Sequence, residues 1–311
     1  MLIDIVMVLA GLLGLMFGGD LLVRGAVAVA QRAGIPPMVI GLTLVGFGTS
    51  TPELVTSLQA AFAGAPGIAI GNVLGSNIAN VLLILGTAAI LAPIRVDRRA
   101  LCRDGAFLVV ATLLCVGLAF SGSFGRPAGA VLVLGLVAFL VAALRLTPRT
   151  DAGETVDVVT DRPALAVGWF LIGLVLTLAG ARFLVDGAVG IATLMGVSDV
   201  VIGLTIVAVG TSLPELVTSV AAARRGHAEV AFGNVLGSNV FNILGILGIT
   251  ALVHPLPVPQ QVLQVDIWVM ALSSALLLLT AATGQGVSRR EGIALLALYI
   301  AYWAWLGFGA S

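Results

Sequence analysis

The sequence lacks lysine and has few charged residues of any kind. Its 311 residues include 15 arginines, which balance the 15 acidic residues, and charged residues make up only 10% of the chain. Soluble globular proteins carry about 25% charged residues, so this composition excludes that class. The balanced net charge also gives no reason to expect nucleic acid as a partner, because phosphate binding draws on a surplus of basic residues.

Histidine and cysteine are also scarce. The two histidines, His227 and His254, lie at predicted loop positions, and the two cysteines, Cys102 and Cys115, lie in a predicted loop and the following span. A hydrolase needs an activated nucleophile or a metal held by imidazole or thiolate, and these residues are too few and too scattered to supply one. We therefore expect the protein not to be an enzyme. We also expect no disulfide framework, no resident cofactor and no obligatory protein partner.

Apolar side chains and glycine are abundant instead. Hydrophobic residues make up 59% of the chain, there are 39 glycines, and the mean hydropathy is +1.16. A bilayer core about 30 Å thick needs about 20 apolar residues per helix, so we expect an all-α membrane protein with ten spans in the lipid bilayer. The predicted spans are 2–23, 38–62, 68–92, 105–120, 127–145, 164–190, 200–222, 229–251, 265–283 and 292–308.

The arginines predict how these spans are oriented, because cytoplasmic loops carry an excess of basic residues. The loops after the odd-numbered spans hold twelve of the 15 arginines; of the other three, Arg126 lies on the opposite side and Arg24 and Arg182 lie inside spans. We therefore expect a protein of the cytoplasmic (inner) membrane with both termini outside. Residues 1–19 lack the basic leading region of a signal peptide, and we expect them to form a retained helix.

A stretch of 46 residues occurs twice, at 41–86 and 203–248, with a constant offset of 162 and identical residues at 29 aligned positions. Each repeat unit contains five predicted spans, an odd number, so the second unit enters the membrane from the opposite face. We expect two inverted repeats, at 1–145 and 164–311. The polar segment between them, 146–163, reads as a cytoplasmic linker, because its acidic residues are not spaced as a calcium-binding loop requires.

Each copy carries one glutamate inside an apolar span, within GTSTPE in the first half and GTSLPE in the second. A carboxylate at the bilayer centre costs on the order of 3 kcal/mol or more, so Glu53 and Glu215 indicate a functional site. Pro52 and Pro214 lack an amide hydrogen, so we expect the second and seventh spans to be broken near the midplane. The breaks would present backbone carbonyls and hydroxyls beside each carboxylate. The hydroxyls belong to Thr49, Ser50, Thr211 and Ser212.

A second duplicated motif, GNVLGSN, with the asparagine three residues after it, supplies polar side chains at i, i+4 and i+8, which share one helical face. These residues are Asn72, Ser76 and Asn80 in the first half and Asn234, Ser238 and Asn242 in the second. Calcium takes about six to eight oxygen ligands, and two glutamates neutralise one divalent ion. The sequence thus predicts a calcium site between the halves, although asparagine and serine alone also serve to join membrane helices.

The first and sixth spans each carry a charged pair, with the signs exchanged. Asp20 lies four residues before Arg24, and Arg182 lies four residues before Asp186. Residues at i and i+4 are neighbours on a helix, so we expect two local ion pairs near the membrane interface. Their glycine-rich surroundings also suit a helix pair that slides against a fixed core.

The twin GTS-x-PE and GN-x-x-GSN motifs in inverted halves resemble the alpha repeats of the calcium/cation antiporter superfamily, and are most similar to those of prokaryotic sodium/calcium exchangers. The resemblance covers essentially the whole chain. It implies alternating access, in which helices one and six slide across a core that holds the ions. It also implies a calcium site made by Glu53, Glu215 and the backbone carbonyls of Thr49 and Thr211, and a central position that involves Asn80 and Asn242. The implied sodium ligands are Gly46 and Ala208 through their carbonyls, with Thr49, Ser50, Ser76, Thr211, Ser212 and Ser238.

The sequence departs from the pattern of that superfamily at one position in each half. Many relatives place an aspartate at the position of Asn80 or Asn242, whereas this chain has asparagine at both. The predicted site therefore has two carboxylates and no third. Exchange of one Ca2+ for three Na+ would move one net charge per cycle, whereas a proton-coupled exchanger would protonate both glutamates when Ca2+ leaves. Both coupling schemes fit the sequence.

Broken helices that meet at the midplane of inverted repeats are typical of ion-coupled carriers. We therefore expect a secondary active antiporter that exchanges Ca2+ for Na+, with H+ coupling as the alternative. A passive cation channel that uses the glutamate pair as its selectivity filter is the less favoured hypothesis. Only an antiporter would reverse its Ca2+ flux when the sodium gradient is reversed.

Overall fold

The computed structural model describes residues 1–145, 163–195, 208–283 and 286–309. In the first half the elements are α1 (Leu2–Ala33), α2 (Pro37–Ile40), η1 (Gly41–Val45), α3 (Gly46–Thr49), α4 (Thr51–Phe62), α5 (Pro66–Ala79), η2 (Asn80–Leu85), α6 (Gly86–Leu91), β1 (Ile94–Arg95), α7 (Arg98–Ala119), β2 (Ser123–Phe124) and α8 (Arg126–Arg145), where η marks π-helical turns. The predicted linker lies outside the described residues except for Pro163, the first residue of the next helix.

The described part of the second half follows a similar order of elements, with one further π-helical turn, η5. They are α9 (Pro163–Leu194), α11 (Ala208–Thr211), α12 (Leu213–Arg224), α13 (Ala228–Val240), η4 (Phe241–Leu247), α14 (Gly248–Val253), β3 (Leu256–Pro257), η5 (Val262–Asp266), α15 (Ile267–Ala282), β4 (Gly286–Val287) and α16 (Arg289–Gly309). In and directly after the duplicated stretch, α4 and α6 correspond to α12 and α14 at the offset of 162 residues that the sequence predicts.

The described helices are long and apolar enough for a multi-pass membrane protein. Seven of them could each cross a membrane, and a pair bent by 41°, Pro37–Thr49 with Thr51–Phe62, raises the number in the described part to eight. A helix occupies every predicted span, although the seventh is described only from Ala208 onward. The count of ten spans therefore stays a prediction.

One predicted boundary is wrong by more than two helical turns. Hydropathy predicts that the first span ends at residue 23, but α1 continues to Ala33 and stops at Gly34, whose φ of 62° and ψ of 33° form a left-handed cap. The hydropathy falls at Asp20 and Arg24, but charged residues are compatible with a helix, and these two form an ion pair on its surface. Hydropathy marks where a span leaves the lipid, whereas the glycine marks where the helix ends.

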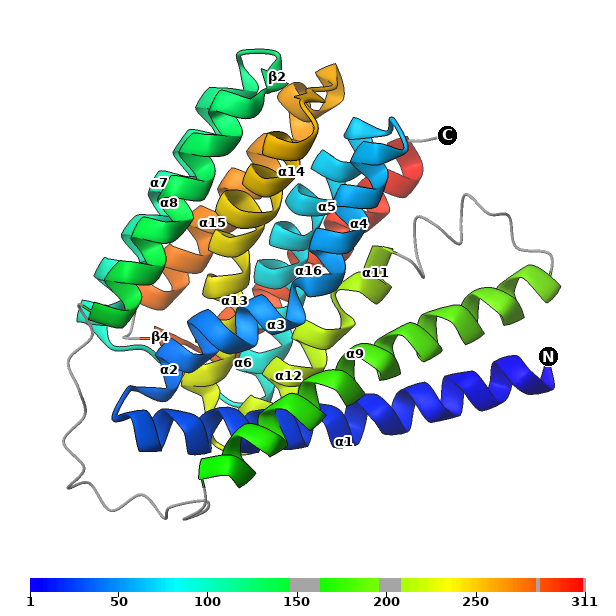
Figure 1. Cartoon of the computed structure of the whole chain (residues 1–311), viewed down its shortest axis with the longest axis vertical. Helices are drawn as coiled ribbons and strands as arrows, with labels where there is room; N and C mark the ends of the chain where they lie inside the picture. The colour runs from blue at the N-terminus through cyan, green and yellow to red at the C-terminus, as the bar shows by residue number, and fades with distance from the viewer. Residues whose placement is uncertain (146–162, 196–207, 284–285, 310–311) are drawn as a thin grey trace.

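The helices α1 and α9 form an antiparallel pair that lies along the lower edge of Figure 1, at a steep angle to the bundle above it. Glycines let their backbones touch. A Cβ at Gly11 would lie 2.5 Å from the Leu184 nitrogen, and one at Gly18 would lie 2.6 Å from the Thr177 nitrogen. Such close approach of small residues is the usual way in which membrane helices associate.

The predicted ion pairs on these two helices are present. The Arg24 and Asp20 side chains are 3.9 Å apart, and those of Arg182 and Asp186 are 3.6 Å apart. Asp20 has a second partner that the sequence did not predict, because Arg225, directly after α12, also binds its carboxylate. This contact ties α1 to the bundle.

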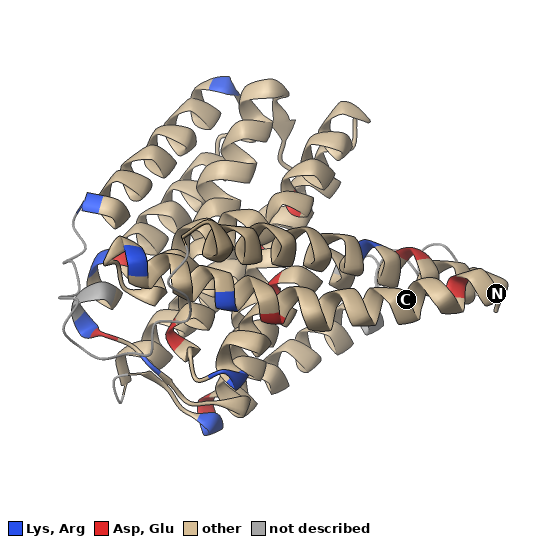
Figure 2. Ribbon diagram, turned by 60° about the horizontal axis from the view of Figure 1, so that its bottom comes forward, with Lys and Arg blue, Asp and Glu red and all other residues tan. Residues whose placement is uncertain are grey.

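The two helices that carry the GNVLGSN motif form the centre of the bundle. Of the seven single-helix candidate spans, these two are the most deeply buried. In the most apolar 18-residue window of each, 78% of the residues are buried in 66–91 (α5, η2 and α6) and 89% in 228–253 (α13, η4 and α14). Outer helices such as α1 and α8 are 22% and 33% buried by the same measure and expose many leucines and valines, as a lipid-facing surface requires. Figure 2 shows that most of the ribbon carries no charged residue.

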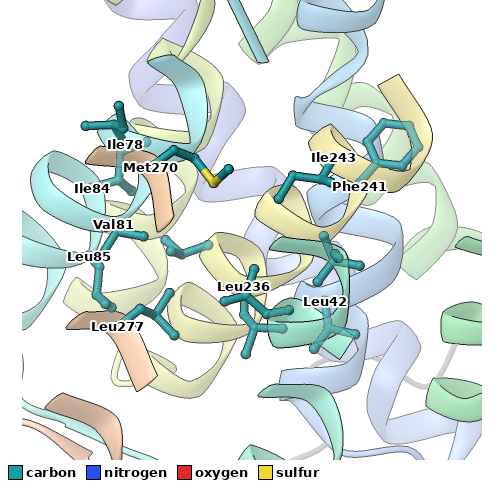
Figure 3. Packing of buried hydrophobic residues seen from close by; sticks show 14 of the residues in the cluster. Leu42, Ile78, Val81, Ile84, Leu85, Leu236, Phe241, Ile243, Met270 and Leu277 are labelled. Atoms are coloured by element: carbon teal, nitrogen blue, oxygen red, sulfur yellow. The ribbon is translucent and has the colours of Figure 1, made fainter. Parts of the chain in front are cut away.

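Apolar packing holds this centre together. Ile78, Val81 and Leu85 from the first half meet Leu236 and Ile243 from the second within one buried cluster (Figure 3). At the ends of the bundle, β1 pairs with β4 and β2 pairs with β3, both antiparallel, so each short ladder joins a loop of one half to a loop of the other. The two halves therefore form one folded unit.

Candidate cation-binding site

The helix breaks predicted at the two prolines place both glutamates. Ser50 separates α3 from α4 with φ −83° and ψ 9°, and Ser212 separates α11 from α12 with φ −91° and ψ 5°. Pro52 and Pro214 lie in the first turns of α4 and α12, where a backbone N–H would have no partner within the helix, so the missing N–H of proline costs nothing. Glu53 and Glu215 consequently lie in the first turn of α4 and α12. The free amides and the dipole of a helix N-terminus favour a negative charge at this position.

Each glutamate is bonded to a serine of the other half. The Ser50 hydroxyl donates to Glu215 Oε1 over 2.8 Å, and Ser212 is the reciprocal side-chain partner of Glu53. Both glutamates are 1% exposed. Within the described part of the chain, Oε2 of each carboxylate has no hydrogen-bond partner. The two repeats thus bring two buried carboxylates together, each with one oxygen anchored and one left over.

Two asparagines of the predicted polar face hold the glutamate segments in place. Asn72 Nδ2 donates to the Glu53 backbone carbonyl over 3.0 Å and to Ser57 Oγ over 2.9 Å. Asn234 Nδ2 makes the equivalent bonds, to the Glu215 carbonyl over 3.4 Å and to Ser219 Oγ over 3.0 Å. These bonds fix the first turns of α4 and α12 against α5 and α13. The sequence placed both asparagines beside the site but did not predict this role.

Other predicted ligands lie where the halves cross. The Thr49 hydroxyl, at the end of α3, donates to the Val45 carbonyl over 3.0 Å and lies 3.4 Å from Asn234 Oδ1. The Ser238 hydroxyl donates across the halves to the Gly46 carbonyl over 3.4 Å. Thr211 ends α11 and Ala208 begins it, next to a stretch outside the described residues. Ser76 is buried in α5.

Asn80 and Asn242 begin or lie within the π-helical turns at the centre. Asn80 Nδ2 donates to Asn239 Oδ1, and Asn242 Nδ2 donates to Asn77 Oδ1, both over 3.0 Å. Among the described residues, Oδ1 of Asn80 and Oδ1 of Asn242 have no hydrogen-bond partner. Sequence reasoning missed Asn77 and Asn239, because they lie off the face shared by Asn72, Ser76 and Asn80. Their identity in both copies is the signal that could have revealed them.

Four of the unpartnered atoms suit a hard cation. They are the two carboxylate oxygens of the glutamates and the two amide oxygens of Asn80 and Asn242, all deep in the bundle. Hard cations such as Ca2+ and Na+ bind oxygen ligands of these types. Among the described residues no three histidine, cysteine, aspartate or glutamate side chains gather, and none of them brings a third carboxylate to this pair.

Long apolar helices around a buried, acidic oxygen cluster at two helix breaks define a multi-pass membrane protein of the ion-transport class. The family model for sodium/calcium exchanger proteins matches residues 3–145 and 165–308. The chain belongs to the sodium/calcium exchanger family.

Individual relatives cover nearly the whole chain. CaxA of Alkalimonas amylolytica, which is assigned as an antiporter, is 40% identical over 97% of this chain and 98% of its own length. The sodium/calcium exchanger MaX1 of Methanosarcina acetivorans is 36% identical over 96% of this chain and 97% of its own. The structure of the sodium-calcium exchanger NCX_Mj soaked with 10 mM Na+ and 10 mM Sr2+ matches with a TM-score of 0.87 at 35% identity, covering 97% of this chain and 98% of that one.

These matches confirm the family that the twin motifs indicate. They place the chain among cation/Ca2+ antiporters of the membrane, and these relatives are exchangers rather than enzymes. The same matches leave the coupling ion, the ligand residues and the transport cycle to be proposed from the site.

Proposed function

We propose that the protein is a secondary active antiporter that exchanges Ca2+ for Na+ across the cytoplasmic membrane, with Glu53 and Glu215 jointly binding the ion. The reciprocal Ser50–Glu215 and Ser212–Glu53 contacts carry this proposal. They hold two carboxylates from opposite halves at one place, each with a free oxygen. Two negative charges neutralise one Ca2+, and the hydroxyl, carbonyl and amide oxygens nearby complete its coordination.

Transport requires the site to open to one side of the membrane at a time. We propose ten spans in two inverted repeats with both termini outside, so that the halves exchange roles between the two open states. The antiparallel α1–α9 pair, joined by glycine contacts and packed on α12, is the element that moves. The bundle of α4, α5, α12 and α13 holds the ions and stays fixed.

Proteoliposomes test the coupling ion. Vesicles loaded with Na+ and diluted into Na+-free medium with Ca2+ should take up Ca2+, and reversal of the sodium gradient should reverse the flux. A pH gradient alone should drive no uptake. Uptake driven only by the pH gradient would instead assign proton coupling, with both glutamates protonated when Ca2+ leaves. Ca2+ flux that follows its own gradient and ignores both ions would indicate a channel.

The glutamates are tested by substitution. Glu53→Gln should abolish sodium-driven Ca2+ uptake, because it removes half of the charge that neutralises Ca2+ and replaces one carboxylate oxygen by an amide NH2. Glu229→Gln, the same change at a half-exposed residue paired with His227, is the control and should transport normally. A folded Glu53→Gln protein with full transport would remove Glu53 from the site.

A further inference from the structure

Hydrogen bonds between asparagine side chains join the central helices of the two halves. Asn77 of α5 and Asn239 of α13 are 1% and 0% exposed and occupy equivalent positions in the two repeats. Neither is part of the proposed ligand set. Each accepts a hydrogen bond from the central asparagine of the other half, Asn242 or Asn80.

Because of these bonds, the oxygen of the Asn80 and Asn242 amides, and not the NH2 group, is left without a hydrogen-bond partner. An asparagine amide can rotate by half a turn, so a neutral Asn80 or Asn242 could present either an oxygen or an NH2 group to its surroundings. Because Nδ2 is occupied by the partner across the halves, Oδ1 is the atom that remains, and it is unpartnered in both residues among the described part of the chain. A cation can use the oxygen and is repelled by the NH2 group.

Of the two bonds, the one from Asn242 is itself anchored, whereas Nδ2 of Asn239 has no hydrogen-bond partner among the described residues. Asn77 Nδ2 donates to the Asn239 backbone carbonyl over 3.5 Å, so rotating the Asn77 amide would turn its oxygen toward a carbonyl oxygen. Asn77 is thereby held with Oδ1 toward Asn242, and Asn242 is held with its own Oδ1 away from Asn77. The turn η2, which begins with Asn80, packs on α12, and η4, which contains Asn242, packs on α4, so each of these turns contacts a helix that carries a glutamate.

We propose that Asn77 and Asn239 are positioning residues, which orient the Asn242 and Asn80 amides so that oxygen rather than NH2 faces the transported cation. The inference rests on the proposed cation transport. It accounts for why the amides of Asn80 and Asn242 both leave an oxygen, rather than an NH2 group, without a partner. In metal sites, loss of such an outer-shell partner typically lowers affinity by about 10- to 100-fold.

The test uses a double-mutant cycle on the purified full chain. Half-saturating concentrations of Ca2+ alone and of Na+ alone are read from ion-dependent thermal stabilisation, which requires no transport. Asn77→Leu is nearly isosteric and should raise the half-saturating concentration of at least one ion about tenfold. In an Asn242→Asp background the same change should have less than about a threefold effect, because a carboxylate presents an oxygen in either orientation.

A merely structural role for Asn77 would give the same factor in both backgrounds, and that result would overturn the proposal. So would an Asn77→Leu protein that keeps both affinities within about threefold of the starting chain. Thr250→Val, which removes a buried hydroxyl of α14 away from these bonds, controls for loss of a buried polar group. If Asn77→Leu does not fold, Asn77→Ala and Asn239→Leu repeat the cycle, the latter against Asn80→Asp. Absence of any ion-dependent stabilisation in the unsubstituted chain would count against the proposed function, not against the orientation of the amides.

Discussion

At the scale of single residues, the two halves use the same side chains with unequal surroundings. Asn72 and Asn234 make equivalent bonds to a glutamate carbonyl and a serine hydroxyl. Only Asn234 is fully buried, and its Oδ1 is also the atom that lies 3.4 Å from the Thr49 hydroxyl. The equivalence reflects the duplication, and the difference reflects what each asparagine meets in the other half.

This difference predicts unequal effects of one substitution. Asn234→Leu should destabilise the protein by about 1 kcal/mol more than Asn72→Leu, because the glutamate and serine partners are equally buried in both halves but only Asn234 also contacts the Thr49 hydroxyl, and one hydrogen bond contributes about 1 kcal/mol. Thermal unfolding of both variants in detergent, without ions, measures the order. Equal melting temperatures for the two variants would show that the extra burial and the Thr49 contact of Asn234 contribute nothing.

The sequence predicts residues of this site better than it predicts their bonds. The prolines locate the breaks at Ser50 and Ser212, and the duplication alone pairs Glu53 with Glu215. The serine-to-glutamate bonds across the halves depend on how two segments 165 residues apart are oriented, which helical periodicity does not encode. The sequence did not predict the roles of Asn77 and Asn239 either, because their hydrogen-bond partners lie on helices of the other half.

At the scale of elements, the helix positions follow from hydropathy, but the α1–α9 contact follows from glycine. Gly11, Gly18 and Gly25 recur every seven residues in α1, and the equivalent glycines of α9 are Gly173, Gly180 and Gly187. Continuous hydrophobicity hides this seam, because lipid-facing and helix-facing positions are both apolar. The Asp20–Arg225 contact was equally hidden, since it joins α1 to a residue 205 positions away.

Two glycine substitutions on α9 test the seam. A Cβ at Gly180 would lie 2.7 Å from the Leu15 nitrogen and 2.9 Å from the Gly11 oxygen, whereas one at Gly168 would meet nothing within 4 Å. Gly180→Ala should therefore push α1 and α9 apart and destabilise the protein by about 1–3 kcal/mol. Gly168→Ala should be neutral or stabilising by up to about 1 kcal/mol, because alanine favours the helix.

Melting temperature and sodium-driven Ca2+ uptake are measured for both glycine variants. Gly180→Ala should lose both stability and transport, and Gly168→Ala should keep both. If Gly180→Ala melted and transported like the unsubstituted protein, the close backbone contact between α1 and α9 would play no part in holding the pair together.

At the scale of the whole molecule, the charge of the site determines how transport responds to membrane potential. Among the described residues the bundle centre holds two carboxylates and otherwise neutral polar groups. Because the protein charge at the site is the same in every loaded state, the net charge moved per cycle equals the difference between the ions exchanged. One Ca2+ against three Na+ moves one positive charge, whereas one Ca2+ against two protons moves none.

The sign of the response follows from the direction of that charge. When Ca2+ enters a vesicle and three Na+ leave, one positive charge leaves, so an inside-positive potential should accelerate Ca2+ uptake and an inside-negative potential should slow it. One elementary charge across 100 mV corresponds to about 2.3 kcal/mol, or roughly a 50-fold change in the Ca2+ accumulation ratio at equilibrium. Valinomycin with opposed potassium gradients sets the two potentials in Na+-loaded proteoliposomes. Ca2+ uptake with the same final ratio at both potentials would mean that the two glutamates exchange Ca2+ for two charges only, and the three-sodium cycle would have to be abandoned.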